Sequence, residues 1–153
     1  MSGESKENPP PMHLVQRMLS HESEFPRTRQ VVPHAERRQF LKRRWRGKAE
    51  DGTEFGFDLE ERLVDGAVIH RCGDKDYIVR QLPETVYRIP LHGIGQAAVI
   101  AWMTGNLHMP AQIVDGALLV LHDEAMGKLI EREGWEFSEA EVLFQPMKAV
   151  AHN

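Results

Sequence analysis

The chain has 153 residues, enough for one medium-sized domain or two small ones. Its content of 41% hydrophobic and 27% charged residues is ordinary for a globular protein. The formal net charge of -4 gives no general attraction to nucleic acid or to anionic lipid, so we expect neither as a partner. No apolar run approaches the roughly 18 residues that span a bilayer.

The first eleven residues are polar and proline-rich, and they lack the apolar core of a signal peptide. We therefore expect residues 1–11 to form a disordered tail. The single cysteine, Cys72, cannot form an internal disulfide. Together these features favour the cytoplasm.

The segment 12–83 shows the pattern of a small β-rich domain. Three dipeptides typical of hairpin turns, Asp51-Gly52, Asp65-Gly66 and Gly73-Asp74, separate runs of strand length at 54–59, 67–71 and 77–82. Residues 22–36 contain two prolines and little periodicity, which is typical of a loop. Pro83 marks the expected boundary of this domain.

A basic stretch at residues 37–48 carries seven positive side chains, with Phe40 and Trp45 among them. Such a mixture could bind single-stranded nucleic acid by charge and stacking, or an acidic protein surface. It could also be a charged strand that packs its apolar residues inward and blocks edge pairing with its cations. Because the chain as a whole is acidic, we favour the charged strand or protein docking.

The second half predicts the order βαββαβ, which is the ferredoxin-like arrangement. Its elements are a strand at 85–89, a helix at 91–103 that ends at Gly105, strands at 111–114 and 117–121, a helix at 123–133, and a strand at 135–144. Asp115-Gly116 is a strong hairpin signal between the two central strands, and Gly134 suits the end of the second helix. The fold class is therefore α+β.

The most informative block is residues 105–112, Gly-Asn-Leu-His-Met-Pro-Ala-Gln. Gly105 and Asn106 tolerate left-handed backbone angles and suit the end of a helix, so His108 would project from a turn. A neutral imidazole there could bind nickel, zinc or copper. A lone histidine in a helix-to-strand turn is more often a capping or core residue.

This block resembles the signature of the UreE family, nickel metallochaperones of urease assembly. Gly105, Asn106, His108, Pro110 and Gln112 match it, whereas Leu107 stands where an arginine is usual. The resemblance covers residues 12–147 and is specific at 105–146. It implies an all-β N-terminal domain (12–83) for protein partners, a ferredoxin-like metal-binding domain (84–147) and a flexible C-terminal tail (148–153).

The resemblance also implies a homodimer that binds nickel through His108 from both subunits near the two-fold axis. His122 matches the first histidine of a His-x-His pair found in the family, although Asp123 and Glu124 follow it here. Glu124 could supply an oxygen ligand, but it also suits the first turn of a helix. His152 stands alone where many members carry a histidine-rich tail, which argues against nickel storage, but His122 or His152 could complete the metal site of the dimer.

The expected function is therefore that of a urease accessory protein that delivers nickel, with the accessory GTPase and the urease apoprotein complex as partners. No enzyme signature is present, and we expect no catalytic activity. An adaptor that binds proteins without delivering metal is the main alternative, and a nucleic-acid-binding module is a more distant one. The other histidines (His13, His21, His34, His70 and His92) are interpreted as structural or solvated, and Cys72 as inert.

Overall fold

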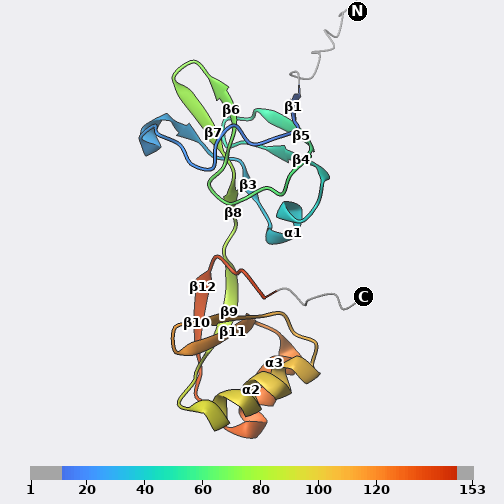
Figure 1. Ribbon diagram of the computed structural model, residues 1–153, viewed down its shortest axis with the longest axis vertical. Coiled ribbons are helices and arrows are strands. Elements are labelled where there is room, and N and C mark those ends of the chain that lie inside the picture. Colours follow the sequence, from blue (N-terminus) through green and yellow to red (C-terminus); the bar gives the residue numbers. More distant parts are fainter. Residues whose placement is uncertain (1–11, 148–153) are drawn as a thin grey trace, which may run out of the picture. The chain divides into compact units, whose positions relative to one another are not determined.

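The computed structural model describes residues 12–147 and has a mixed α+β fold. The predicted tails 1–11 and 148–153 lie outside the described residues. The chain divides between Leu82 and Pro83 into two compact units, which are shown in Figure 1 and are described separately below. None of the helices within residues 12–147 has the length and apolar character needed to cross a bilayer.

The N-terminal unit is built from small sheets of short strands. Its strands are β1 (His13–Val15), β2 (Gln30–Val31), β3 (His34–Ala35), β4 (Arg44–Lys48), β5 (Glu54–Asp58), β6 (Val68–Cys72), β7 (Lys75–Ile78) and β8 (Arg80–Gln81). They form sheets of order β1-β5-β4, β2-β7-β6 and β3-β8. A 3-10 turn, η1 (Arg27–Arg29), and a one-turn helix, α1 (Arg37–Phe40), complete the unit.

Two of the predicted turns in this unit join paired strands, and the third does not. Gly52 and Gly73 adopt positive φ between β4 and β5 and between β6 and β7, which are antiparallel pairs. Gly66 also has positive φ, but the strands on either side of it, β5 and β6, are not paired. There the Asp65 carboxylate accepts a hydrogen bond from the backbone N–H of Gln81 at 2.7 Å, so this turn docks on β8 instead.

The segment 22–36, predicted as a loop, contains η1, β2 and β3. The two strands are only two residues long and pair in parallel with β7 and β8. Their partners lie more than forty residues further along the chain, so the pairing depends on tertiary contacts that local periodicity does not reveal.

Aromatic and branched side chains form the core of the N-terminal unit. Phe55, Phe57, Ile78 and Val79 are almost fully buried. Trp45 stacks on Phe57 with ring centroids 3.8 Å apart. Alternation along β4 thus directs Trp45 inward and leaves Arg44, Arg46 and Lys48 exposed.

The C-terminal unit has the predicted element order. Its elements are β9 (Glu84–Pro90), α2 (Ile94–Asn106), β10 (Ala111–Val114), β11 (Ala117–Leu121), α3 (Glu124–Glu133) and β12 (Ser138–Val142). The four strands form one antiparallel sheet in the order β10-β11-β9-β12. Gly116 and Gly134 adopt the left-handed angles expected for the hairpin turn and the end of α3.

Both faces of this sheet are covered. Leu118 and Val120 of β11 pack with Ile100 of α2 and Leu129 of α3, so the two helices cover one face, as Figure 1 shows. Phe144 is fully buried with Leu119 and Val86 on the other face. The segment after β12 is thereby fixed to the sheet.

Helix α3 begins and ends with the capping residues that its sequence predicts, Asp123 and Gly134. Asp123 caps the first turn by accepting a hydrogen bond from the Met126 N–H at 3.1 Å. The final strand is shorter than predicted, because Trp135–Phe137 form a connection and β12 begins at Ser138.

Candidate metal centre

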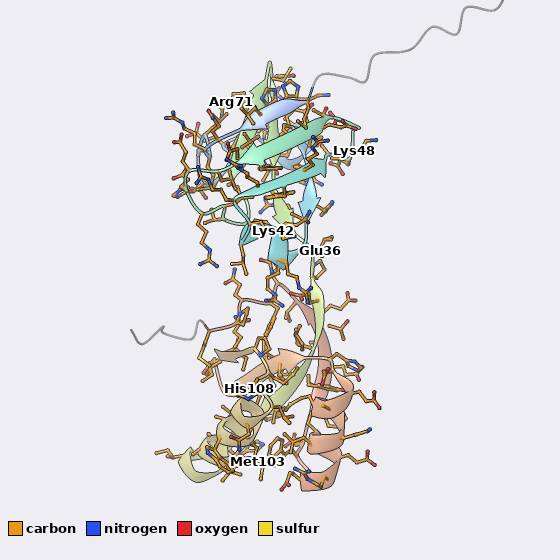
Figure 2. The ribbon with its side chains drawn as sticks, turned by 90° about the vertical axis from the view of Figure 1, so that its right-hand side faces the viewer. Glu36, Lys42, Lys48, Arg71, Met103 and His108 are labelled. Carbon is orange, nitrogen blue, oxygen red and sulfur yellow. The ribbon has the colours of Figure 1, made fainter. Side chains whose placement is uncertain are left out.

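His108 lies in a tight turn between α2 and β10. Its backbone N–H donates to the Gly105 carbonyl at 2.9 Å. Among the described residues it is the one non-glycine position with positive φ, at 55°. The side chain is exposed beside the end of α2, where Figure 2 labels it.

The left-handed position is His108, whereas we expected Gly105 or Asn106 to adopt it. Helix α2 continues through both of those residues, three further than the predicted end at residue 103. Pro110 restricts Met109 to extended angles. The chain must therefore reverse before Met109, and His108 makes the reversal. Histidine is enriched several-fold among non-glycine residues with such angles.

Exposed apolar side chains lie close to this turn in the sequence. Leu91, Ile94, Ala98 and Trp102 recur at helical spacing and predicted the helix. Leu91 packs against the core, whereas the other three face solvent; Ile94 is 92% exposed and Trp102 is 67% exposed. The face of α2 that packs on the sheet instead contains Ile100 and Thr104. The unit thus has an apolar helix face that no described residue covers.

Gln112, the last residue of the matching block, holds the C-terminal segment. Its side-chain oxygen accepts a hydrogen bond from the Gln145 N–H at 2.9 Å. Two residues further on, the Met147 N–H donates to the Ala111 carbonyl at 2.8 Å. The end of the described chain is therefore fixed to β10, close in sequence to His108.

His122 follows β11 and is oriented by two partners. Its Nε2 lies 3.0 Å from a carboxylate oxygen of Glu139, and its ring stacks on Tyr87 with centroids 4.5 Å apart. A carboxylate only accepts hydrogen bonds, so Nε2 carries the proton and the lone pair of a neutral ring lies on Nδ1. A carboxylate that holds one nitrogen of a histidine while the other binds metal is a common arrangement.

The predicted ligands are not assembled into a closed site. The register of the β10–β11 hairpin pairs Ala111 with Val120, so His108 and His122 leave the hairpin at the same end. Within residues 12–147, however, no three His, Cys, Asp or Glu side chains are grouped so as to hold a metal. The third predicted ligand, His152, lies outside the described residues.

Sequence reasoning did not single out Tyr87 and Glu139, although both position His122. The two residues are directly paired across β9 and β12. Nothing in the local sequence links either one to His122, since the link arises from the order of strands in the sheet. Glu124, considered as an oxygen ligand, instead forms an ion pair with Lys128 at 3.1 Å.

His92 is exposed, as predicted, with its Nε2 3.0 Å from a Glu136 carboxylate oxygen. Two histidines of the N-terminal unit, His13 and His70, have ring centroids only 4.3 Å apart. Burial first, and the neighbouring His13 second, hold the pKa of His70 below its ordinary value.

The basic stretch 37–48 is part helix and part strand rather than one charged strand. Glu36 and Gln39 form a reciprocal capping box, which starts the helical turn of α1. Within β4 the expected pattern holds, with cations outward and Trp45 inward. Lys42 and Lys48, labelled in Figure 2, are both exposed, so this surface is open to an acidic partner.

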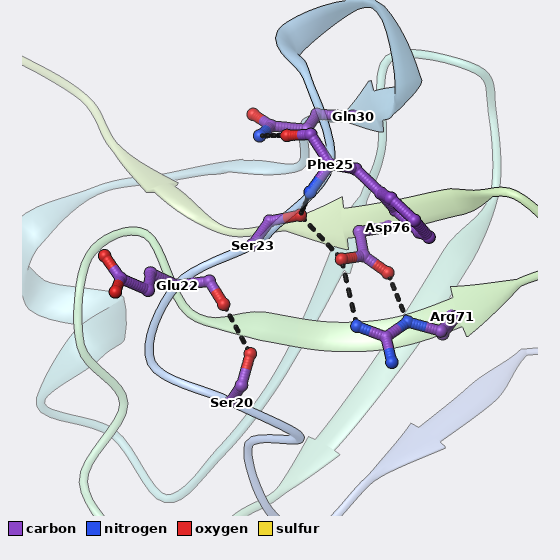
Figure 3. A network of polar contacts seen from close by, with 7 residues as sticks. All are labelled: Ser20, Glu22, Ser23, Phe25, Gln30, Arg71 and Asp76. Atoms are coloured by element: carbon purple, nitrogen blue, oxygen red, sulfur yellow. Dashed lines mark hydrogen bonds and ion pairs between the residues drawn. The ribbon is translucent and has the colours of Figure 1, made fainter.

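A buried carboxylate, Asp76, organises the other side of the N-terminal unit (Figure 3). It accepts hydrogen bonds from Arg71 at 2.6 and 3.2 Å and from the Ser23 hydroxyl at 2.6 Å. The Ser23 hydroxyl in turn accepts from the Phe25 N–H, and the Arg71 guanidinium lies over the Phe25 ring. The hydrogen bond from Arg71 is the main reason that the pKa of Asp76 is lowered. This network fixes the loop before η1 to β6 and β7, so its role is structural.

Comparison with known proteins defines the class as that of urease accessory proteins. Residues 84–153 match the family model described as the C-terminal domain of the UreE urease accessory protein. A "Urease accessory protein UreE" from Bacillus cereus is 31% identical over 115 residues, covering 73% of this chain and 76% of the relative. The protein of the same name from Geobacillus kaustophilus is 33% identical, covering 67% and 74%. That from Chelativorans is 29% identical, covering 69% and 68%.

The chain therefore belongs to the UreE family. This is a family of accessory chaperones and not of enzymes.

Proposed function

We propose that this protein is a homodimeric metallochaperone that binds nickel between subunits and delivers it for assembly of the urease metallocentre. The observation that carries the proposal is His108, an exposed imidazole in a left-handed turn beside an uncovered apolar helix face. One imidazole cannot hold a metal ion. A two-fold axis near His108 would bring two together, because a symmetric interface repeats each residue.

The two units would have separate functions, metal binding and partner binding. We assign the metal site to a ferredoxin-like domain, residues 84–147, which the βαββαβ order and the antiparallel sheet β10-β11-β9-β12 support. The β-rich domain, residues 12–83, would bind protein partners, and its exposed cations between residues 37 and 48 suit an acidic surface.

His122 and His152 would complete the coordination sphere. The contact with Glu139 leaves Nδ1 of His122 available to a metal. Met147 is bonded to β10 at Ala111, three residues after His108. His152 is five positions after Met147, a span of at most about 17 Å, so a ligand at that position can reach the neighbourhood of His108.

A shallow, imidazole-rich site suits delivery, because its ligands can exchange with those of an acceptor. A closed tetrathiolate site would hold the metal too firmly. We propose the urease accessory GTPase and the urease apoprotein complex as the acceptors, and the cytoplasm as the compartment. Nickel is the proposed cargo, although zinc and copper also accept imidazole ligands.

The alternative function is a protein-binding adaptor that delivers no metal. Leu107, in place of the usual arginine, favours it, because Leu107 adds to the exposed apolar surface beside His108. In that case both the apolar face of α2 and the basic surface of the N-terminal unit would contact proteins, and His108 would only shape the turn.

Nickel titration calorimetry, with the mass measured by light scattering on the same samples, separates the two functions. The informative variant is His108→Asn, because asparagine also tolerates left-handed angles but lacks an imidazole. His92→Asn is the matched control, since it removes another exposed histidine of the same unit. The chaperone function predicts about one nickel per dimer, lost in His108→Asn and retained in His92→Asn. If the wild-type protein bound no nickel, the chaperone function would be excluded and the adaptor function would be favoured.

A further inference from the structure

A second feature of the C-terminal unit is an open pocket of about 380 Å³ between α3, β9 and the start of β12. Three aromatic side chains, Tyr87, Trp135 and Phe137, line it, together with the carboxylates Glu131 and Glu139. None of the proposed nickel ligands lines this pocket, although Tyr87 and Glu139 of its lining both contact His122. The Tyr87 ring separates His122 from the pocket, because it contacts His122 by stacking and Phe137 edge-on.

Glycine makes room for the pocket. Gly127 of α3 faces Tyr87, and a Cβ at this position would lie 2.8 Å from the tyrosine hydroxyl. Any larger residue at 127 would displace the Tyr87 side chain from its place in the pocket wall.

The hydroxyl of Tyr87 is a polar group of the pocket lining that has no protein partner among the described residues. Tyr87 is only 8% exposed, and among residues 12–147 its hydroxyl forms no hydrogen bond. This hydroxyl is not sealed from solvent, so a ligand bearing an N–H donor would replace water as its partner.

The charged residues around the pocket indicate that its ligand is a cation. Glu131 and Glu139 line the pocket, and residues 123–141 contain seven carboxylates against two cations, Lys128 and Arg132. Neither cation is free for the pocket, since Lys128 pairs with Glu124 and Arg132 with Glu133. An anion would be repelled. An apolar group would cover carboxylates without compensating them.

We propose that this pocket receives an arginine side chain from a partner protein. A guanidinium is planar and stacks on aromatic faces, and it offers five N–H donors to carboxylates and to a hydroxyl acceptor. Aromatic walls, the Tyr87 hydroxyl, the Glu131 carboxylate and the Glu139 carboxylate that is shared with His122 satisfy each of these properties. The pocket thus binds a basic segment of a partner beside His122, whose partners Tyr87 and Glu139 belong to the pocket lining.

The test is an NMR titration of the full-length, chelator-treated protein with N-acetyl-arginine amide, using N-acetyl-citrulline amide as the neutral isostere. Removal of metal makes the outcome independent of nickel binding. We expect the arginine probe to shift the Trp135 indole and the Gly127 and Gly134 amide resonances saturably, with millimolar affinity, and the citrulline probe to leave them unchanged. Equal shifts with both probes, or none with arginine, would overturn the proposal.

Three variants at exposed or half-exposed positions sharpen this test. Glu131→Gln removes one carboxylate of the pocket and should weaken arginine binding about three- to fivefold, the range of an exposed ion pair. Glu133→Gln makes the same change on the same helix outside the pocket and should leave binding unaltered. Phe137→Leu, at a half-exposed position, should also weaken binding by removing one aromatic wall. Equal losses in Glu131→Gln and Glu133→Gln would show that general acidity attracts the probe and would refute a specific pocket.

Discussion

At the scale of single residues, His108 combines an exposed imidazole with a backbone angle that few side chains adopt. The strain has a local cause in Pro110, which restricts Met109 and moves the reversal to the preceding residue. The block 105–112 could therefore be recognised from the sequence, whereas the residue that bears the strain could not. Predicting it required knowledge of where α2 ends.

The contact between His122 and Glu139 gives a prediction for nickel affinity. Replacing Glu139 with alanine removes the carboxylate that fixes the imidazole, and we expect nickel to bind about tenfold more weakly, as for other metal ligands that lose such a partner. Calorimetric titration measures the change. Glu141→Ala is the matched control, because Glu141 is also exposed on β12. Unchanged affinity in Glu139→Ala would remove His122 from the proposed coordination sphere.

Asp76 gives a prediction for stability. Asp76→Ala deprives Arg71 and Ser23 of their common acceptor, and we expect the free energy of unfolding to fall by about 2 kcal/mol. Urea denaturation followed by circular dichroism measures the loss. Asp74→Ala, an exposed position in the adjacent turn, should change stability by less than about 0.5 kcal/mol. Similar losses in the two variants would contradict a structural role for the network in Figure 3.

At the scale of elements, helical spacing found α2 but gave no indication of which face is buried. Ile94, Ala98 and Trp102 form a regular apolar stripe, and the structure places them in solvent. A stripe that packs on a sheet of the same chain and one that packs on another chain have the same period. Strand positions in the C-terminal unit were predictable from turn residues, whereas β2 and β3 were too short and too non-local to be found.

The exposed apolar stripe of α2, formed by Ile94, Ala98 and Trp102, leads to a prediction about dimer formation. If it lies in the dimer interface, Trp102→Glu should bury a charge there and convert the protein to a monomer. Light scattering or sedimentation measures the mass. Ala125→Glu introduces the same charge at an exposed position of α3 and should leave the dimer intact. A dimeric Trp102→Glu protein would place the interface elsewhere.

The contact between His13 of β1 and His70 of β6 predicts that the stability of the fold depends on pH. The pKa of His70 is lowered in the folded protein, so the unfolded chain binds a proton more readily and acid favours unfolding. Stability contributed by this group is complete above the ordinary histidine pKa of about 6.5 and declines as the pH falls below it. In His70→Gln, urea denaturation at pH 7.5 and pH 5 should show a smaller loss than in the wild type. His34→Gln, an exposed histidine of the same unit, should retain the wild-type loss.

At the scale of the whole molecule, family membership follows from the comparisons, and the sequence block 105–112 had already indicated it. The coordination sphere could not be predicted in full. His108 precedes the β10–β11 hairpin and His122 follows it, His152 lies beyond the described residues, and the second His108 would belong to another subunit. A site divided in this way leaves no compact motif in one sequence.

Metal binding by the whole protein should depend on pH. Imidazole binds a metal ion only when neutral, so nickel and protons compete for the same nitrogen atoms. We expect calorimetric titration to give a much lower nickel affinity at pH 5 than at pH 7.5, because free imidazole groups lose their proton near pH 6.5. Equal affinities at the two pH values would exclude imidazole as the main ligand.

The attachment of the C-terminal segment to β10 has a consequence for kinetics. Because the bonds at Gln112 and Ala111 fix the chain as far as Met147, the ligand that we propose at His152 would act as a tethered ligand. A short tether maintains an effective concentration of about millimolar, without any new contact. Such a ligand would dissociate and rebind without leaving the neighbourhood of the site, so the proposed cargo could pass from one ligand set to another without full release to solvent.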